Sequence, residues 1–340
     1  MIKNIHVNHV TSPLLKWQAG FSLVELMVAI ALGIFLVIGV TNILFSGQQS
    51  FNATNRIARV QENGQLAKNM LINDLKRARY MGANVELQNL GGSVGASAIA
   101  STCNRGNTTW GSMVEQGLFG LDNNQIDDNG TTYGCITAIN ANPGIRIAGT
   151  DILTIRYASP WQPTTFNANT LYIRSSFTAS WIFAGSNAGD VDNNEQSSNI
   201  AGVNDTDPIN STHELIAYSY YVGDSGRDCP EGSSIPSLFR VSLDNNFRPR
   251  QVEEIFPGIE NFQVQFSTDG STYVDANAIT DWDAVRSTQI WLLARSECPE
   301  GGHNDDRSYS SPGTTPDVSN YIPGDSYRRE EYTSIISHRN

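Results

Sequence analysis

The chain has few cysteines, and none stands in the close spacing that binds zinc. Its 340 residues contain four, and the absence of a C-x-x-C pair argues against a zinc ribbon or a thioredoxin-like redox site. Its five histidines likewise show no metal-ligand spacing. Basic side chains are scarce, with 22 Lys and Arg against 34 Asp and Glu. Because such an acidic body repels phosphates, we expect no direct nucleic-acid binding.

Negative charge is absent from the first 24 residues, and proline is absent from residues 21–82. Within this stretch, residues 21–45 form an apolar run whose one charged side chain is Glu25. At about 1.5 Å of rise per residue, a helix of this length spans the roughly 30 Å hydrocarbon core of a bilayer. Lys3 and Lys16 precede the run. That asymmetry predicts a cytoplasmic N-terminus and a periplasmic body.

No A-x-A cleavage site follows the apolar run, which argues against an ordinary secretory signal peptide. The small residue, Gly20, instead precedes the run, and residues 20–26 read GFSLVEL. This heptapeptide closely resembles the type IV prepilin motif. The resemblance implies cleavage between Gly20 and Phe21 by a prepilin peptidase, followed by N-methylation of Phe21.

The carboxylate of Glu25 needs a partner, because a charge inside the bilayer costs about 2.5–3.5 kcal/mol at the helix centre and less near an end. In pilin-like assemblies, the resemblance implies that Glu25 pairs with the Phe21 amine of a neighbouring subunit. Such a pair in a low dielectric would set the register between helices. The alternative is an uncleaved anchor whose Glu25 reaches the membrane interface.

A helical pattern continues beyond the apolar run. Apolar or small side chains recur at steps of three and four, the spacing of one helix face, at Ile57, Val60, Gly64, Ala67, Leu71, Leu75 and Ala78. We therefore predict one helix over about residues 21–81, with Gly82 as its stop. Its first half would be membrane or filament core, and its second half would pack under a globular domain.

Strand patterns follow the helix. Period-two alternation predicts half-buried strands at residues 152–157, 238–243 and 262–266, and denser apolar runs predict central strands at 215–222 and 290–294. Polar stretches at 186–211 and 300–325 read as long surface loops. The predicted fold class is α+β: a long N-terminal helix packed on a mainly antiparallel β-sheet domain. The predicted organisation is a leader (1–20), a transmembrane or filament-core half-helix (21–45), an amphipathic half-helix (46–82) and a β-rich body (83–340).

The C-terminal part adds a more specific resemblance. Residues 285–296, the stretch 260–270 and Tyr327-Arg328-Arg329 are similar to the PilW family of type IV pilus minor pilins. The resemblance implies a pilin-like fold and no enzymatic activity. It implies a subunit that primes pilus assembly at or near the filament tip, moving from the inner membrane to the cell-surface pilus.

The partners implied by the resemblance are other minor pilins, the major pilin, the prepilin peptidase, the inner-membrane assembly platform and a PilY-type tip adhesin. The pilus would support adhesion, twitching motility or DNA uptake. Two alternatives remain open: a J-type minor pseudopilin of type II secretion, and a pilus-borne adhesin that uses the fibre as a stalk.

The cysteine count is even, and the body is expected in an oxidising compartment, which suggests up to two disulfides. Cys103, Cys135, Cys229 and Cys298 allow three pairings, of which the sequential one (103–135 and 229–298) is the simplest. Free buried thiols are the alternative. The tetrapeptide CPEG occurs at both residues 229–232 and 298–301, which suggests two matching turns at strand ends.

Two further patterns resemble functional sites. Residues 223–226 spell GDSG, the nucleophile motif of chymotrypsin-like proteases, but no suitable histidine accompanies them; we interpret them as a hairpin turn. Asp190, Asp192 and Asn194 place oxygen ligands at alternate positions, as an EF-hand loop does, but the expected glycine and final acid are missing. A solvated acidic loop is the preferred interpretation, with weak Ca²⁺ binding as the alternative; no other cofactor is expected.

Overall fold

The computed structural model describes residues 20–83, 90–94, 97–98, 117–122, 143–177, 179–187, 211–242, 252–312 and 319–338. The chain divides into two compact units, residues 1–54 and 55–340. One long helix, α1 (Leu23–Leu75), begins in the first unit and ends in the second. The remaining described elements are strands and two short 3₁₀ segments, η3 (Gly185–Asn187) and η4 (Ala276–Ala278), all in the second unit.

The helix α1 ends at Leu75, earlier than the predicted end near residue 81. The chain leaves the helical path because Arg79 adopts a φ of 70°. The Arg79 N–H donates to the carbonyl oxygen of Arg156 (3.0 Å) rather than continuing the helical ladder. A strand therefore supplies the backbone acceptor, which the spacing of apolar side chains could not reveal.

Within the described residues, the larger sheet contains nine strands. Seven follow one another in the spatial order β2 (Ser97–Ala98), β1 (Leu90–Val94), β6 (Ser180–Ala184), β5 (Leu171–Ser175), β7 (Ser211–Asp228), β4 (Ile152–Ala158) and β3 (Leu118–Leu121). β8 (Ser234–Ser242) pairs with β7, and β9 (Glu253–Pro257) pairs with β8. All these pairs are antiparallel except β1 with β6, which is parallel.

The second sheet is antiparallel and lies near the C-terminus. Its order is β11 (Val274–Asp275), β10 (Ile259–Ser267), β12 (Ser287–Arg295) and β15 (Arg329–Ser337). A small two-stranded sheet joins β13 (Tyr309–Ser310) to β14 (Ser319–Tyr321). The predicted strands in residues 152–294 all occur, and with α1 they confirm the α+β fold class.

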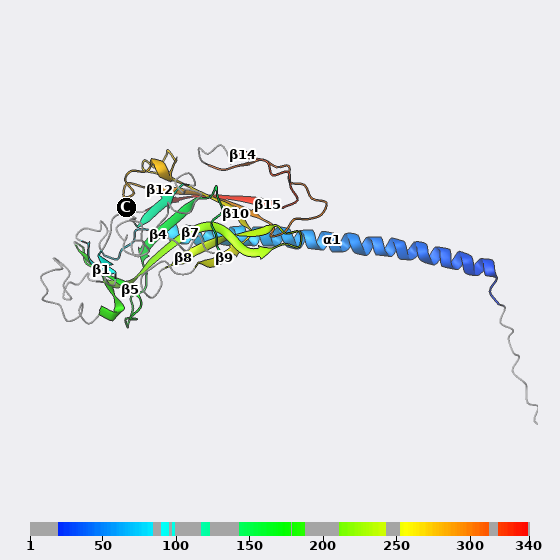
Figure 1. Cartoon of the computed structure of the whole chain (residues 1–340), viewed down its shortest axis with the longest axis horizontal. Helices are drawn as coiled ribbons and strands as arrows, with labels where there is room; N and C mark the ends of the chain where they lie inside the picture. The colour runs from blue at the N-terminus through cyan, green and yellow to red at the C-terminus, as the bar shows by residue number, and fades with distance from the viewer. Residues whose placement is uncertain are drawn as a thin grey trace, which may run out of the picture. The chain divides into compact units, whose positions relative to one another are not determined.

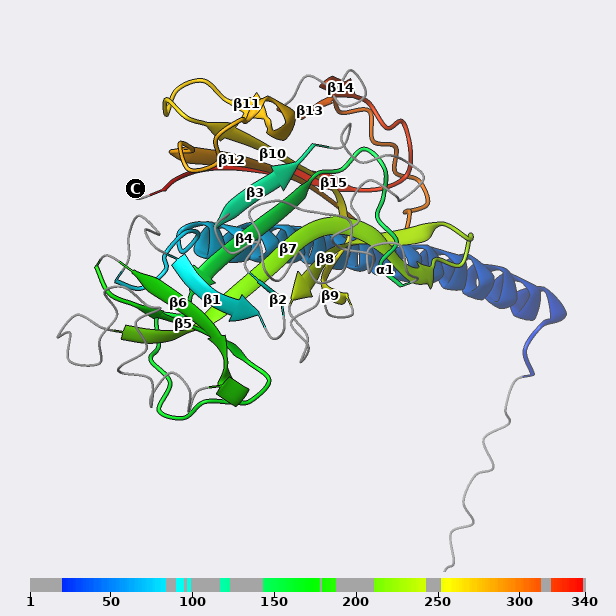
Figure 2. The same ribbon diagram turned by 60° about the vertical axis from the view of Figure 1, so that its left-hand side comes forward.

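The main core joins the second-unit part of α1 to both sheets (Figures 1 and 2). Leu71 and Leu75 of α1 are fully buried against side chains such as Tyr220 of β7 and Phe262 of β10. The predicted stripe is the buried one, except that Ile57 at its start is 38% exposed. The stripe thus positions α1 between the two sheets.

Strand β12 is apolar on both faces because both faces are covered. Ile290 and Leu292 belong to the main core, whereas Trp291 and Leu293 pack against Tyr309 on the other face. Trp161, by contrast, is 81% exposed.

Candidate functional site

The predicted processing site lies immediately before α1. Gly20 and Phe21 precede the helix, and the Ser22 carbonyl accepts the Leu26 N–H at 3.0 Å, the first helical bond. The Phe21 side chain is 83% exposed. The peptide bond between Gly20 and Phe21 is therefore outside the helical ladder.

Glu25 lies in the first turn of α1 and is exposed. A negative charge there is favourable, because the unsatisfied N–H groups at a helix N-terminus carry partial positive charge. Every large apolar side chain of residues 21–51 is also more than half exposed, from Phe21 to Phe51. Among the described residues, α1 is the one helix long and apolar enough to cross a membrane.

The buried side of α1 contains a carboxylate that the sequence pattern missed. Asp74 is 6% exposed. Its two oxygens accept hydrogen bonds from the hydroxyls of Tyr157 in β4 (3.0 Å) and Tyr220 in β7 (2.5 Å). Burial and the neighbouring Asp74 charge raise the pKa of both tyrosines, so both remain hydroxyl donors. The sequence feature that could have indicated the burial of Asp74 is its position: it lies three residues after Leu71, on the same helix face as the apolar stripe.

A second buried charge lies within the C-terminal motif. The Arg329 guanidinium is fully buried and contacts three carboxylates: Glu260 (2.5 Å), Asp325 (2.6 Å) and Asp305 (3.3 Å). Burial alone would lower the pKa of Arg329, but hydrogen bonds with Asp325 and Glu260 raise it. The same hydrogen bonds from Arg329 hold the pKa of Asp325 below its usual range. We call these four side chains the Arg329 cluster; it joins β15 to β10 and to the segments around 305 and 325.

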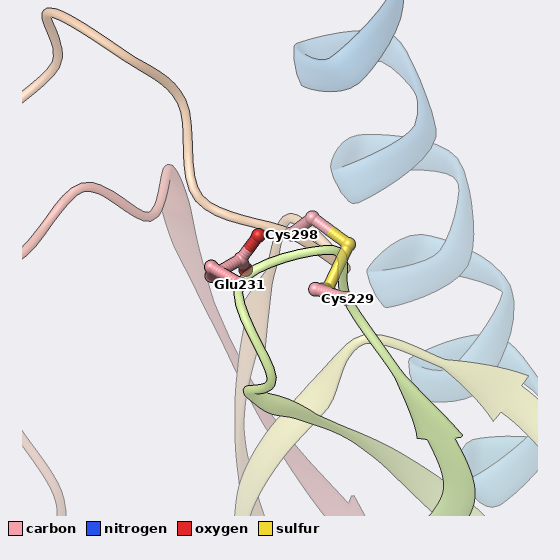
Figure 3. Close-up of side chains that lie close together, drawn as sticks. All are labelled: Cys229, Glu231 and Cys298. Carbon is pink, nitrogen blue, oxygen red and sulfur yellow. A yellow bond between two sulfur atoms is a disulfide. The ribbon is translucent and has the colours of Figure 1, made fainter.

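A disulfide joins Cys229 to Cys298, with Cα atoms 5.7 Å apart. It links the turn between β7 and β8 to the segment after β12, and so connects the two sheets (Figure 3). Glu231 lies near the two sulfurs. Because both sulfurs are in the disulfide, neither is available as a thiolate, and these three residues do not form a metal site.

Several predicted site residues lie outside the described residues. They are Cys103, Cys135, Asp190, Asp192 and Asn194.

The interpretation of residues 223–226 as a hairpin turn was wrong. They lie inside β7, where the pairing with β8 shifts register between Asp224 and Asp228, and Gly226 adopts a φ of 70°. The turn follows at residues 229–233. Ser225 and His213 both belong to β7 and are separated by twelve positions, which at about 3.3 Å per residue corresponds to roughly 40 Å along an extended strand. These two side chains cannot act together as nucleophile and base.

Comparison with known proteins identifies one family. Residues 219–340 match the family described as Type IV Pilus-assembly protein W, which confirms the resemblance to PilW for this part of the chain. Among solved structures, a type IV-like pilin from Thermus thermophilus is 13% identical, with a TM-score of 0.28, over 56% of this chain and 78% of its own. That score is too low to support any argument. No curated protein matches.

Proposed function

We propose that this chain, whose residues 219–340 match the family described as Type IV Pilus-assembly protein W, is a minor pilin that primes filament assembly. In this proposal it joins the pilus at or near the tip and supports adhesion, twitching motility or DNA uptake. Its partners are the major pilin, other minor pilins, the assembly platform and a PilY-type adhesin. The β-rich body selects the partners, and α1 supplies the packing.

The observation that carries the proposal is the exposure of apolar side chains around the whole first half of α1. Even the least exposed of the large ones, Val28, is 53% exposed. A helix that is apolar on all sides is stable only in lipid or among other apolar helices. A subunit that passes from a membrane into a filament core meets both environments in turn.

Processing would supply the partner for Glu25. Cleavage after Gly20 would remove the leader, residues 1–20, and leave a new α-amino group on Phe21, four residues before Glu25. Before assembly, residues 21–45 would span the inner membrane. The rest of α1, as far as Leu75, would form the amphipathic half-helix, and the body from residue 83 would lie in the periplasm. In the filament, the Phe21 amine of one subunit would pair with Glu25 of the next.

Piliation tests the role of Glu25. We expect Glu25→Gln to leave membrane insertion intact and to reduce surface fibres to less than about a tenth, because a loss of 1.4 kcal/mol already changes an equilibrium tenfold. Glu25→Asp should retain part of the activity. Glu62→Gln is the matched control, since Glu62 is an exposed carboxylate further along the same helix. Fibres are counted by shearing and electron microscopy.

Four results would contradict parts of the proposal. Normal fibre numbers for Glu25→Gln would remove the proposed pairing. A mature protein whose mass still includes residues 1–20 would exclude the proposed processing. A deletion strain that keeps its fibres but no longer exports a secreted enzyme would instead indicate a J-type pseudopilin. Fibres that persist without adhesion would indicate a pilus-borne adhesin.

A further inference from the structure

Two grooves open beside Val60 of α1, which lines both. On α1, the first groove is lined by Arg56, Arg59 and Asn63, and the second by Ile57 and Gln61. Residues three or four apart share a helix face. The grooves therefore flank the same turn of the helix, and both belong to the unit of residues 55–340.

The second groove, of about 260 Å³, has arginines that already have carboxylate partners. Arg307 contacts Asp305 at 3.2 Å, Arg328 contacts Glu300 at 2.5 Å, and Arg329 belongs to the cluster described above. This groove has no unmatched positive charge among these arginines.

The first groove, of about 200 Å³, differs from the second. We call it the arginine groove; its charged lining is Arg56, Arg59, Arg295 and Glu297. Arg56 donates to the carbonyl oxygen of Pro299 at 2.7 Å. Among the described residues, no carboxylate lies within ion-pair distance of Arg56 or Arg59.

Arg295 adds an unsatisfied donor. Its Nη2 donates to the carbonyl oxygen of Ser234 (2.8 Å), and its Nη1 lies 4.0 Å from Glu260, which is itself paired with Arg329. Its Nε is buried and has no hydrogen-bond partner within the described part of the chain. A buried donor without a partner costs about 1–3 kcal/mol.

The lining of the groove thus contains three guanidinium groups and one carboxylate, Glu297, in a chain whose net charge is −12, and among the described residues only Arg295 of the three lies within 4.0 Å of a carboxylate, that of Glu260. Guanidinium groups bind carboxylates with paired, charge-assisted hydrogen bonds. Small-molecule pockets usually measure about 300–1,000 Å³, so this volume suits a single side chain better.

We propose that the arginine groove binds an acidic side chain of an adjacent pilus subunit. The inference rests on the proposed function, since that function supplies the neighbour. It identifies a second inter-subunit ionic contact, on the body of the protein, besides the one proposed for Glu25.

Cross-linking in intact fibres tests the contact directly. Arg59→Lys places a primary amine in the groove. A carbodiimide activates a carboxylate, the amine attacks it, and an amide forms as the urea by-product leaves. We expect a cross-link from the substituted position to a glutamate or aspartate of another subunit, identified by mass spectrometry and absent from wild-type fibres. A link to Glu297 of the same chain alone, or no link, would overturn the proposal.

Charge reversal tests whether the contact matters for assembly. We expect Arg59→Glu to reduce the amount of this chain in sheared fibres at least fivefold. Lys76→Glu, the same charge change at an exposed position outside the groove, should leave it unchanged. An intact Cys229–Cys298 disulfide, seen by gel mobility without reductant, shows that the variant folds.

The two proposals fail in different ways. If wild-type chain never enters the fibres, the minor-pilin function fails and the groove contact fails with it. If wild-type chain and Arg59→Glu enter equally, only the groove contact is refuted.

Discussion

The two halves of α1 differ in what surrounds them, although one unbroken helix forms both. In the first unit, large apolar side chains point in every direction and remain more than half exposed. In the second, one stripe is buried, and Ala67, Leu71 and Leu75 are 0% exposed. An all-round apolar pattern requires an apolar environment on all sides, whereas a stripe requires a core on one side only. The sequence pattern distinguishes the two environments.

The glycines of α1 differ in the same way. Methyl groups added at Gly33, Gly39 or Gly47 would meet nothing within 4 Å. A methyl group at Gly64 would lie 2.1 Å from the Tyr332 ring of β15. Gly64 is thus required by close packing within the domain.

The largest predicted effect on the free energy of unfolding concerns a substitution in the domain of residues 55–340. Arg329→Met would leave Glu260, Asp305 and Asp325 without their shared buried cation, and breaking such a pair costs about 3–5 kcal/mol. Denaturant unfolding of the full chain in detergent measures the loss. Arg227→Met, which removes an exposed arginine from its pair with Glu254, should cost about 1 kcal/mol or less.

The pH dependence of this loss has a definite sign. Hydrogen bonding to Arg329 lowers the pKa of Asp325 in the folded protein, so its contribution is present above the unfolded value, near 3.9, and disappears as the pH falls through the folded value. The difference between wild type and Arg329→Met should therefore shrink below about pH 4. A difference that grows in acid would contradict the assigned pairing.

An intermediate effect is expected at the helix–sheet contact. Gly64→Ala should destabilise the domain by about 1–3 kcal/mol, because overpacking against Tyr332 outweighs the roughly 1 kcal/mol gain in helix propensity. Gly39→Ala makes the same chemical change where space is open, so only the helix-propensity gain of roughly 1 kcal/mol remains and the helix should not be destabilised. Equal changes in the free energy of unfolding at both positions would contradict the proposal that only the second half of α1 is closely packed.

The smallest effect comes from His338. Burial, together with the nearby Arg79 charge, lowers its pKa to about 4, and its Nε2 lies 2.7 Å from the Thr288 hydroxyl oxygen. Stability from the neutral ring is fully present above pH 6.5 and is lost as the pH falls toward 4. Because the side chain is partly exposed, we expect a loss on the order of 1–2 kcal/mol.

The control for this titration is His338→Gln, which keeps a hydrogen-bonding side chain and should flatten the curve of unfolding free energy against pH between pH 6.5 and 4.

Glu25 is the one titratable side chain of residues 20–54. The titration therefore reports almost entirely on the domain. An unchanged curve in His338→Gln would assign the titration to another group, such as His213, whose pKa burial also lowers.

Prediction from the sequence succeeded where a local repeat carries the information. The steps of three and four revealed the buried face of α1, and period-two alternation revealed where β4, β8 and β10 lie. The prediction that these strands are half-buried was wrong for β4, which is buried at every residue. Prediction failed where the burial of a residue depends on partners that are distant in the sequence. From the sequence, Asp74 is simply a polar residue. Its place in the core depends on Tyr157 of β4 and Tyr220 of β7, whose hydroxyls donate hydrogen bonds to its carboxylate.

The Arg329 motif could be recognised but not explained from the sequence. Its carboxylate partners come from position 260, far along the chain, as well as from 305 and 325. The GDSG stretch was misplaced for a related reason: glycine marks turns and bulges alike, and only the pairing of β7 with β8 distinguishes them.

The hydrogen bonds of Asp74 bear on how the domain carries mechanical load. A slip of α1 by one turn would move the carboxylate about 5.4 Å along the helix axis and away from both tyrosine hydroxyls. It would also leave the buried carboxylate without its two tyrosine donors, at a cost of about 1–3 kcal/mol for each lost hydrogen bond. A pulling force along the helix axis is therefore transmitted to β4 and β7 together. These hydrogen bonds oppose sliding of α1 relative to the sheet.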